Sequence, residues 1–131
     1  IETLSARWAE LLGVPVPEAR WTDTRDLAHT TYRGAPTEGR SRLAFFQLGP
    51  QAQLELIEPD HEPSTWREFL DAHGTGLHHI AFGLKGMDQV LAVLEAHQMP
   101  AVQRGDYTGG RYAYVESDKW LGCILELLEN D

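Results

Sequence analysis

The segment "GTGLHHIAF", residues Gly74–Phe82, places two histidines side by side within an apolar run. A short apolar run that follows glycines predicts a buried strand, here over Leu77–Leu84. Side chains of a strand alternate between its two faces. We therefore expect Ile80 and Phe82 to pack against helices, and His79 to lie on the opposite face, toward the inside of a curved sheet.

A second pattern occurs twice in the chain. "QLELIEPD" (Gln53–Asp60) and "ILELLEND" (Ile124–Asp131) share a Leu-Glu-Leu core, a second Glu and a closing Asp. Aligning the two copies makes Glu55 equivalent to Glu126. Each copy ends a block that contains a helical pattern, so the repeat predicts two related halves.

Three helices are predicted from the spacing of apolar residues. The first lies within residues 1–15 and the second within residues 87–100, and each stretch ends in proline. The third is a short helix in the connector, residues 59–76, where Thr65 and Glu68 have the spacing of a capping box.

The predicted strands complete an α+β fold that we expect to form a single domain over residues 1–131. The second block, 77–131, has the order strand, helix, strand, strand, strand. The first block, 1–58, lacks the leading strand, which would lie upstream of Ile1. The predicted strands are Asp26–Arg33, Arg42–Leu48, Ala52–Glu58, Leu77–Leu84, Val102–Tyr107, Arg111–Glu116 and Leu121–Leu128.

Composition excludes several classes of partner. The net charge is −9, which argues against nucleic acid, because phosphate binding needs clustered Lys and Arg. No segment approaches the roughly 18 consecutive apolar residues of a membrane helix. The single cysteine, Cys123, cannot form an internal disulfide and fits a reducing compartment. With no secretory signal pattern in the chain, we expect a cytoplasmic protein.

The strand pattern places three chemically active side chains on equivalent faces. Glu55 and Glu126 each stand between leucines in a strand, where a carboxylate is costly to bury unless it is paired or bound to a cation. Together with His79 they suggest a shared divalent metal, for which Zn, Ni, Co, Mn and Fe are all suitable. Taken alone, Glu55 would be a solvated edge residue and His79 a core histidine. His78 is expected to be structural.

Other residues offer weaker signals. Tyr112 and Tyr114 share one face of their predicted strand and are either core residues or part of a substrate pocket. Phe46 is a further candidate for the lining of such a pocket. No serine or cysteine nucleophile motif is present, and the "TGGRY" stretch lacks the spacing of a phosphate loop.

"GLHHIAF", "GGRYAYV" and "LGCILELLE" resemble the second half of proteins in the vicinal oxygen chelate superfamily. This is the group of glyoxalases, bleomycin resistance proteins and extradiol dioxygenases, within which the chain is most similar to methylmalonyl-CoA epimerase and glyoxalase-like families. The resemblance implies two βαβββ modules that form a cupped mixed sheet around a metal. It implies Glu55, His79 and Glu126 as ligands, with a fourth, usually histidine, about six residues before Ile1.

The same resemblance implies a function. We expect a metal-dependent isomerase or lyase that acts on a small carbonyl or acyl-thioester substrate through an enediolate-like intermediate, with Glu126 as the general base. Family members commonly pair modules within a chain or across a dimer, so a homodimer is expected. The catalytic glutamate of the epimerase has no counterpart in "RLAFFQLG", residues 42–49, which counts against epimerase activity.

Two alternatives remain within the same fold. One is an Fe-dependent ring-cleaving dioxygenase, which needs two histidines and one carboxylate. The other is a non-catalytic protein that binds a small molecule such as a drug in an apolar pocket, lined by Trp21, Phe46 and Tyr114. In that case two carboxylates would be buried without a cation, which ranks this reading last.

Overall fold

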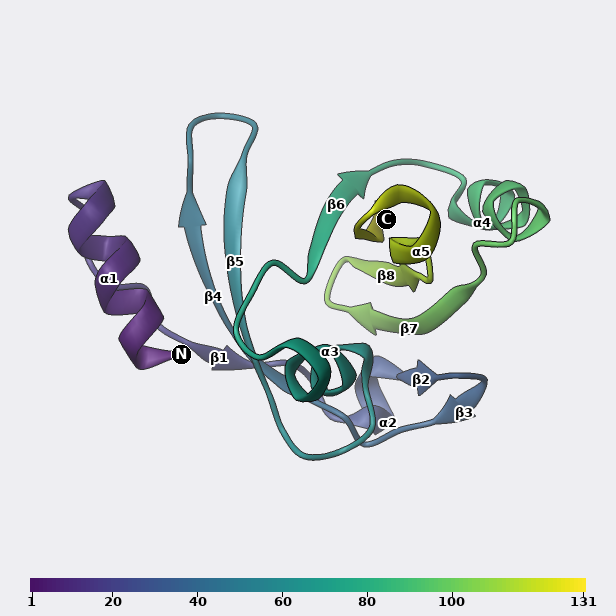
Figure 1. The fold of residues 1–131 in the computed structure, drawn as a ribbon, viewed down its shortest axis with the longest axis horizontal. Coiled ribbons are helices and arrows are strands. Elements are labelled where there is room, and N and C mark those ends of the chain that lie inside the picture. Colours follow the sequence, from purple (N-terminus) through teal and green to yellow (C-terminus); the bar gives the residue numbers. More distant parts are fainter.

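The computed structural model describes all residues 1–131, and its strands form two sheets (Figure 1). The helices are α1 (Glu2–Leu12), α2 (Arg25–Ala28), α3 (Thr65–His73), α4 (Met87–Ala96) and α5 (Asp118–Leu121). The strands are β1 (Arg20–Trp21), β2 (Thr31–Tyr32), β3 (Ala35–Pro36), β4 (Ser41–Gln47), β5 (Gln53–Pro59), β6 (His79–Gly83), β7 (Ala101–Tyr107), β8 (Gly110–Val115) and β9 (Ile124–Asn130). None of the helices combines the length and apolar composition that crossing a bilayer requires.

The two sheets differ in size and in what covers them. One has three strands in the order β1-β4-β5, and the other has six in the order β3-β2-β7-β8-β9-β6. Figure 1 shows α1 beside the small sheet and α4 beside the large one, at opposite ends of the molecule. The mixed α+β class predicted from the sequence is confirmed, as are the helices now seen as α1, α3 and α4.

The second half of the chain follows the predicted order of elements. β6 precedes α4, and the hairpin of β7 and β8 precedes β9, with the unpredicted helix α5 between β8 and β9. β6 pairs with β9 in parallel, whereas β8 pairs with both of its neighbours antiparallel. The parallel pairing puts Ile80 beside Leu125 and Phe82 beside Leu127, on one face of the sheet.

That face forms the core beneath α4. Met87 and Leu91 of the helix are buried against Ala113, Val115 and Leu127 of the sheet. Since alternate residues point the other way, the opposite face carries Tyr112 and Tyr114 from β8 and Glu126 from β9. Because α4 covers one face of the large sheet, only side chains on the opposite face can contribute to a binding or catalytic site.

The small sheet is covered by α1 in the same manner. Ala9 of the helix packs against Ala44, Phe46 and Leu56. Glu55, which alternates with Leu56 along β5, therefore points away from α1.

Four details of the sequence-based predictions are wrong. Asp26–Arg33 is not a strand, because α2 occupies its first part, His29 then adopts a left-handed conformation (φ 48°), and only Thr31–Tyr32 pair. The last strand begins three residues later than predicted, because α5 and a left-handed Gly122 precede it.

The other two concern burial and capping. Ile80 and Phe82 lie on the predicted face but are about half exposed, because β6 is the terminal strand of its sheet. The cap of α3 is Ser64, whose hydroxyl accepts a hydrogen bond from the Arg67 nitrogen at 3.0 Å. Thr65 is the first helical residue and no capping box forms.

Candidate metal centre

Three strands from different parts of the chain bring the predicted ligands together. Glu55 lies on β5, His79 begins β6 and Glu126 lies on β9. The His79 Nε2 atom is 3.1 Å from Oε2 of Glu126 and 3.5 Å from Oε2 of Glu55. One donor atom of each residue lies within 4.8 Å of the other two. This spacing allows all three to contact one ion.

Strand pairing explains why these side chains meet. In the parallel pair, Ala81 lies opposite Glu126, which sets His79 diagonally across from that carboxylate on the same face. On the other side of β9, Tyr114 lies opposite Glu126. β5 and β6 are terminal strands that each pair on one side only, so Glu55 approaches from the other sheet rather than along a shared ladder.

The cluster is buried and rich in negative charge. The side chains of Glu55, His79 and Glu126 are 20%, 9% and 9% exposed. Burial, together with the charge of Glu126, raises the pKa of Glu55 to about 7 against the opposing effect of His79. Burial lowers the pKa of His79, but the hydrogen bond to Glu126 and the charges of both carboxylates outweigh it and raise the pKa above its usual value.

No Lys or Arg forms an ion pair with either carboxylate, so His79 is their one basic partner. A buried pair of carboxylates with so little positive charge beside it is costly. Two carboxylates and an imidazole are also a donor set that divalent transition metals accept. The residues present therefore fit a divalent cation.

Behind His79, a second histidine links the cluster to the connector helix. The Nδ1 atoms of His78 and His79 are 3.0 Å apart, and Nε2 of His78 is 3.2 Å from Oγ1 of Thr65. Burial and the neighbouring His79 lower the pKa of His78 to about 4, although a hydrogen bond with the Thr65 backbone opposes this. His78 is therefore neutral over the physiological pH range.

The two tyrosines lie on the face of the candidate site. Tyr114 is fully buried, and its hydroxyl accepts a hydrogen bond from Nε1 of Trp66 at 3.0 Å. Burial and the charges of Glu126 and Glu55 raise the pKa of Tyr114 well above its usual value. Tyr112 accepts a hydrogen bond from Nε2 of Gln103 at 3.2 Å, and burial raises its pKa to about 12.

The sequence profile described as the glyoxalase/bleomycin resistance protein/dioxygenase superfamily matches residues 1–115. The chain belongs to this superfamily. The resemblance noted from the histidine pair and the two Leu-Glu-Leu strands is thereby confirmed. Among curated proteins, the uncharacterized protein YqjC of Bacillus subtilis (strain 168) is 34% identical over 95 residues, which span 70% of this chain and 67% of that protein.

Several solved structures share the fold of this chain at low sequence identity. The hypothetical protein BH1468 from Bacillus halodurans C-125 aligns with a TM-score of 0.66 and 19% identity, over all of this chain and 86% of its own. Methylmalonyl-CoA epimerase from Mycobacterium tuberculosis aligns with a TM-score of 0.62 and 20% identity, over 99% and 80%. A methylmalonyl-CoA epimerase in complex with methylmalonyl-CoA and NH4+ aligns with a TM-score of 0.61 and 18% identity, over 99% and 86%.

One predicted pocket residue of this superfamily member lies elsewhere. Phe46 is 3% exposed in the core under α1, on the face opposite Glu55. The phenylalanine of β4 that shares the face of Glu55 is Phe45, which pairs directly with Glu55 and is 44% exposed. The sequence contains no signal that shows which of these two adjacent phenylalanines packs in the core under α1. Only the register of β4 against β5 decides it.

Proposed function

We propose that this superfamily member is a metal-dependent isomerase or lyase. Its substrate would be a small carbonyl or acyl-thioester compound that reacts through an enediolate-like state. The observation that supports this most directly is the convergence of Glu55, His79 and Glu126 in a buried cluster without a Lys or Arg partner. Such a cluster is costly to maintain unless a cation occupies it.

In this proposal each side chain has a definite role. Glu55, His79 and Glu126 hold the cation, which supplies a Lewis acid to polarise oxygens of the substrate. Glu126 also serves as the catalytic base, because the contact with His79 holds its carboxylate in place. Tyr112 and Tyr114 line the substrate side of the site, and Phe45 takes the place first assigned to Phe46.

The side chains of β4 indicate whether the reaction uses one base or two. A two-base epimerase removes a proton from one face of the substrate and returns one to the other face. The residues of β4 that share the face of Glu55 are Ser41, Leu43, Phe45 and Gln47, none of which is an acid or a base at neutral pH. We therefore favour a reaction that moves the proton with a single base, on the same class of substrate that the epimerase relatives are named for.

The organisation of the whole domain is part of the proposal. We propose a single domain built from two βαβββ modules, residues 1–58 and 77–131, joined by the connector 59–76. β6 supports this, because it pairs with β9 in parallel while the matching edge of β5 has no partner strand. The fourth ligand upstream of Ile1 and the homodimer remain predictions, which mass spectrometry of the native protein and sedimentation can test.

The two alternatives fit the site less well. A ring-cleaving dioxygenase uses two histidines and one carboxylate, whereas this cluster offers one histidine and two carboxylates. His78 does not supply the second imidazole, because its nitrogens face His79 and Thr65. A drug-binding protein would leave the carboxylates of the cluster buried without a counter-ion.

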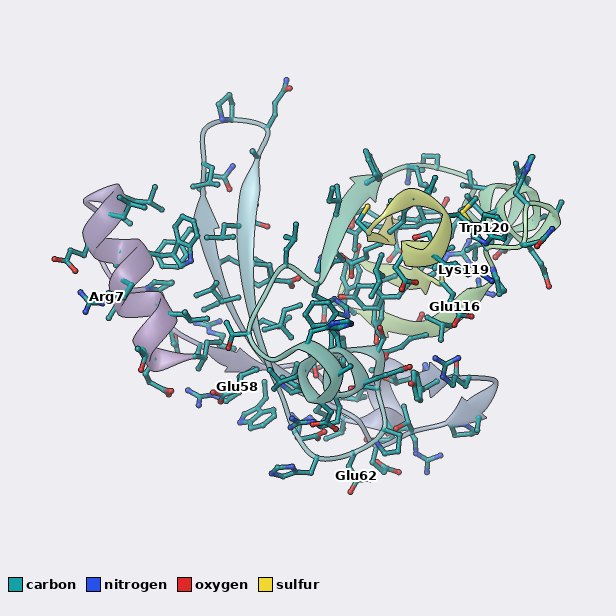
Figure 2. The ribbon with its side chains drawn as sticks, viewed as in Figure 1. Arg7, Glu58, Glu62, Glu116, Lys119 and Trp120 are labelled. Atoms are coloured by element: carbon teal, nitrogen blue, oxygen red, sulfur yellow. The ribbon has the colours of Figure 1, made fainter.

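Metal content provides the test. The purified protein, loaded in turn with Zn, Ni, Co, Mn and Fe, should retain at least one of these metals at one ion per chain after dialysis. His79→Ala and Glu126→Ala should each lose it. Glu62→Gln is the matched control, since Glu62 is an exposed carboxylate on the connector loop, outside the cluster (Figure 2). Unchanged metal content in both cluster variants, or none in the wild type, would refute the proposal.

A further inference from the structure

His79 has hydrogen-bonding partners on both of its ring nitrogens. Nε2 faces the carboxylates of the cluster, with Glu126 at 3.1 Å. Nδ1 lies 3.0 Å from Nδ1 of His78, whose other nitrogen is 3.2 Å from Oγ1 of Thr65. Thr65 is the first residue of α3, so a continuous chain of contacts runs from this helix to the candidate ligand.

With a cation bound, only one arrangement of protons is consistent with the contacts that link Thr65, His78 and His79. A histidine that binds a cation through Nε2 must present a lone pair there, so the proton of the neutral ring lies on Nδ1. That proton can then be donated to Nδ1 of His78, which must be an acceptor. The remaining proton of His78 is consequently on Nε2, where it faces Thr65.

The His78 ring is itself held by its surroundings. It meets the rings of Phe69 and Tyr114 edge to face, with centroids 5.3 Å and 5.2 Å away. Thr65 is anchored too, because its backbone nitrogen donates to the buried side chain of Gln103 at 2.8 Å. An acceptor fixed in this way orients the ring that donates to it.

We propose that His78 is a positioning residue, which fixes the orientation and the proton position of His79 so that Nε2 of His79 is presented to the cation. This inference rests on the proposed metal site. It assigns to His78 a role that does not require it to touch the cation or the substrate. The stretch "LHHI" then contains one candidate ligand and the residue that aims it.

Three variants test this role. His78→Phe keeps a ring between Phe69 and Tyr114 but has no nitrogen to accept the proton. His78→Asn loses the ring but places a side-chain oxygen near the position of Nδ1, so it restores the acceptor. His78→Leu is the second non-accepting variant, of smaller volume, in case the phenylalanine does not fit.

The first readout is the affinity for zinc, measured by competition with a chelator. Loss of an outer hydrogen-bonding partner typically weakens metal binding by about 10–100-fold, which is the loss expected for the two non-accepting variants. His78→Asn should bind close to wild type. The second readout is nitrogen-15 NMR of the zinc-loaded protein, in which the Nδ1 proton of His79 should be slowly exchanging in wild type and fast in His78→Phe.

The outcomes separate the two proposals. If the wild type binds no zinc or other divalent metal, the proposed function fails and the role of His78 fails with it. If the wild type binds zinc and both non-accepting variants bind equally well with the Nδ1 proton unchanged, only the role of His78 is overturned. Equal weakening in His78→Asn and in the non-accepting variants would also overturn it, because the acceptor would then not matter.

Discussion

Glu58 and Glu129 occupy equivalent positions in the two halves of the molecule. Glu58, on β5, contacts the nitrogen of Ile1 at the start of α1, at 2.6 Å, and accepts a hydrogen bond from Arg42 at 3.0 Å. Arg42 also pairs with Glu2 in the first turn of that helix. Figure 2 shows Glu58 near the start of α1.

Glu129 repeats these contacts in the second half. Its carboxylate accepts hydrogen bonds from the nitrogens of Gly86 and Met87 at the start of α4, and from Arg111. Arg111 also pairs with Asp88 in the first turn of the helix. The sequence repeat therefore extends to matching side-chain contacts, each of which joins a helix start to the strand that carries a candidate ligand.

We expect the two arginines of these contacts to contribute similarly to stability. Arg42→Met and Arg111→Met should each lower the free energy of unfolding by a small and similar amount, because solvent screens ion pairs at the surface. Urea titration measures this. Arg7→Met is the control, since Arg7 pairs with Glu10 only at the exposed surface of α1 and should change little. A large loss for one arginine and none for the other would contradict the equivalence.

Glu55→Gln should stabilise the metal-free protein at alkaline pH. The pKa of Glu55 is raised to about 7, so the folded state favours the protonated carboxyl. The stability that depends on this proton is present below the ordinary pKa of 4.5 and is lost as the pH rises through 7. Glutamine avoids the loss, by an amount on the order of 2 kcal/mol at pH 8 once partial exposure is allowed for.

Thermal unfolding of both proteins between pH 4 and pH 8, with a chelator present, measures this effect. The difference between the variant and wild type should grow with pH over that range. Zinc should reverse the order, because the variant lacks one carboxylate donor. A constant difference across the pH range would show that Glu55 is not held in an unfavourable charged state.

Tyr114→Phe should destabilise the fold through Trp66. Removing the hydroxyl leaves the buried Nε1 group of Trp66 without its acceptor, which costs about 1–3 kcal/mol. Tyr107→Phe is the control: its hydroxyl donates to Asn130 at the surface, and its loss should matter by less than about 0.5 kcal/mol.

Substitutions of Phe45 and Phe46 should have different effects, with Phe46 needed for stability and Phe45 for ligand binding. Phe46→Ala empties part of the core under α1 and should cost about 3–5 kcal/mol. Phe45→Ala should cost less than about 1 kcal/mol, since that ring is partly exposed. The zinc-loaded Phe45→Ala variant should bind benzohydroxamate, a probe with two adjacent oxygens and an aryl ring, more weakly than wild type. Unchanged binding would place the pocket away from Phe45.

Much of the candidate site was predictable because strands have a strict two-residue period. Glu55 alternates with leucines on its strand, and Glu126 does the same on the equivalent strand, so both had to leave the apolar face that the helices cover. The same alternation predicted that His79 and Ile80 lie on opposite faces of their strand. These inferences needed local geometry and the internal repeat, and the structure brings the three side chains within reach of one ion.

Features that depend on register or on distant partners were not predictable. Nothing local separates Phe45 from Phe46, because both are apolar and each would suit either face. The segment Asp26–Arg33 has strand-like composition. Its conformation is decided by the left-handed turn at His29 and by the pairing of Thr31–Tyr32 with β7. The cap of α3 was misplaced by one residue, since Ser64 and Thr65 have similar capping propensity.

The sequence alone determined which face of each strand would be apolar, where the main helices would form, and that two glutamates and a histidine would share the other face. Those properties follow from the chemistry and spacing of neighbouring residues. The tertiary structure decided that Phe45 faces the site, that His78 lies between His79 and Thr65, and that Glu55 reaches the cluster from a separate sheet. These depend on how strands pair and sheets approach one another, and residues far apart in the chain set both.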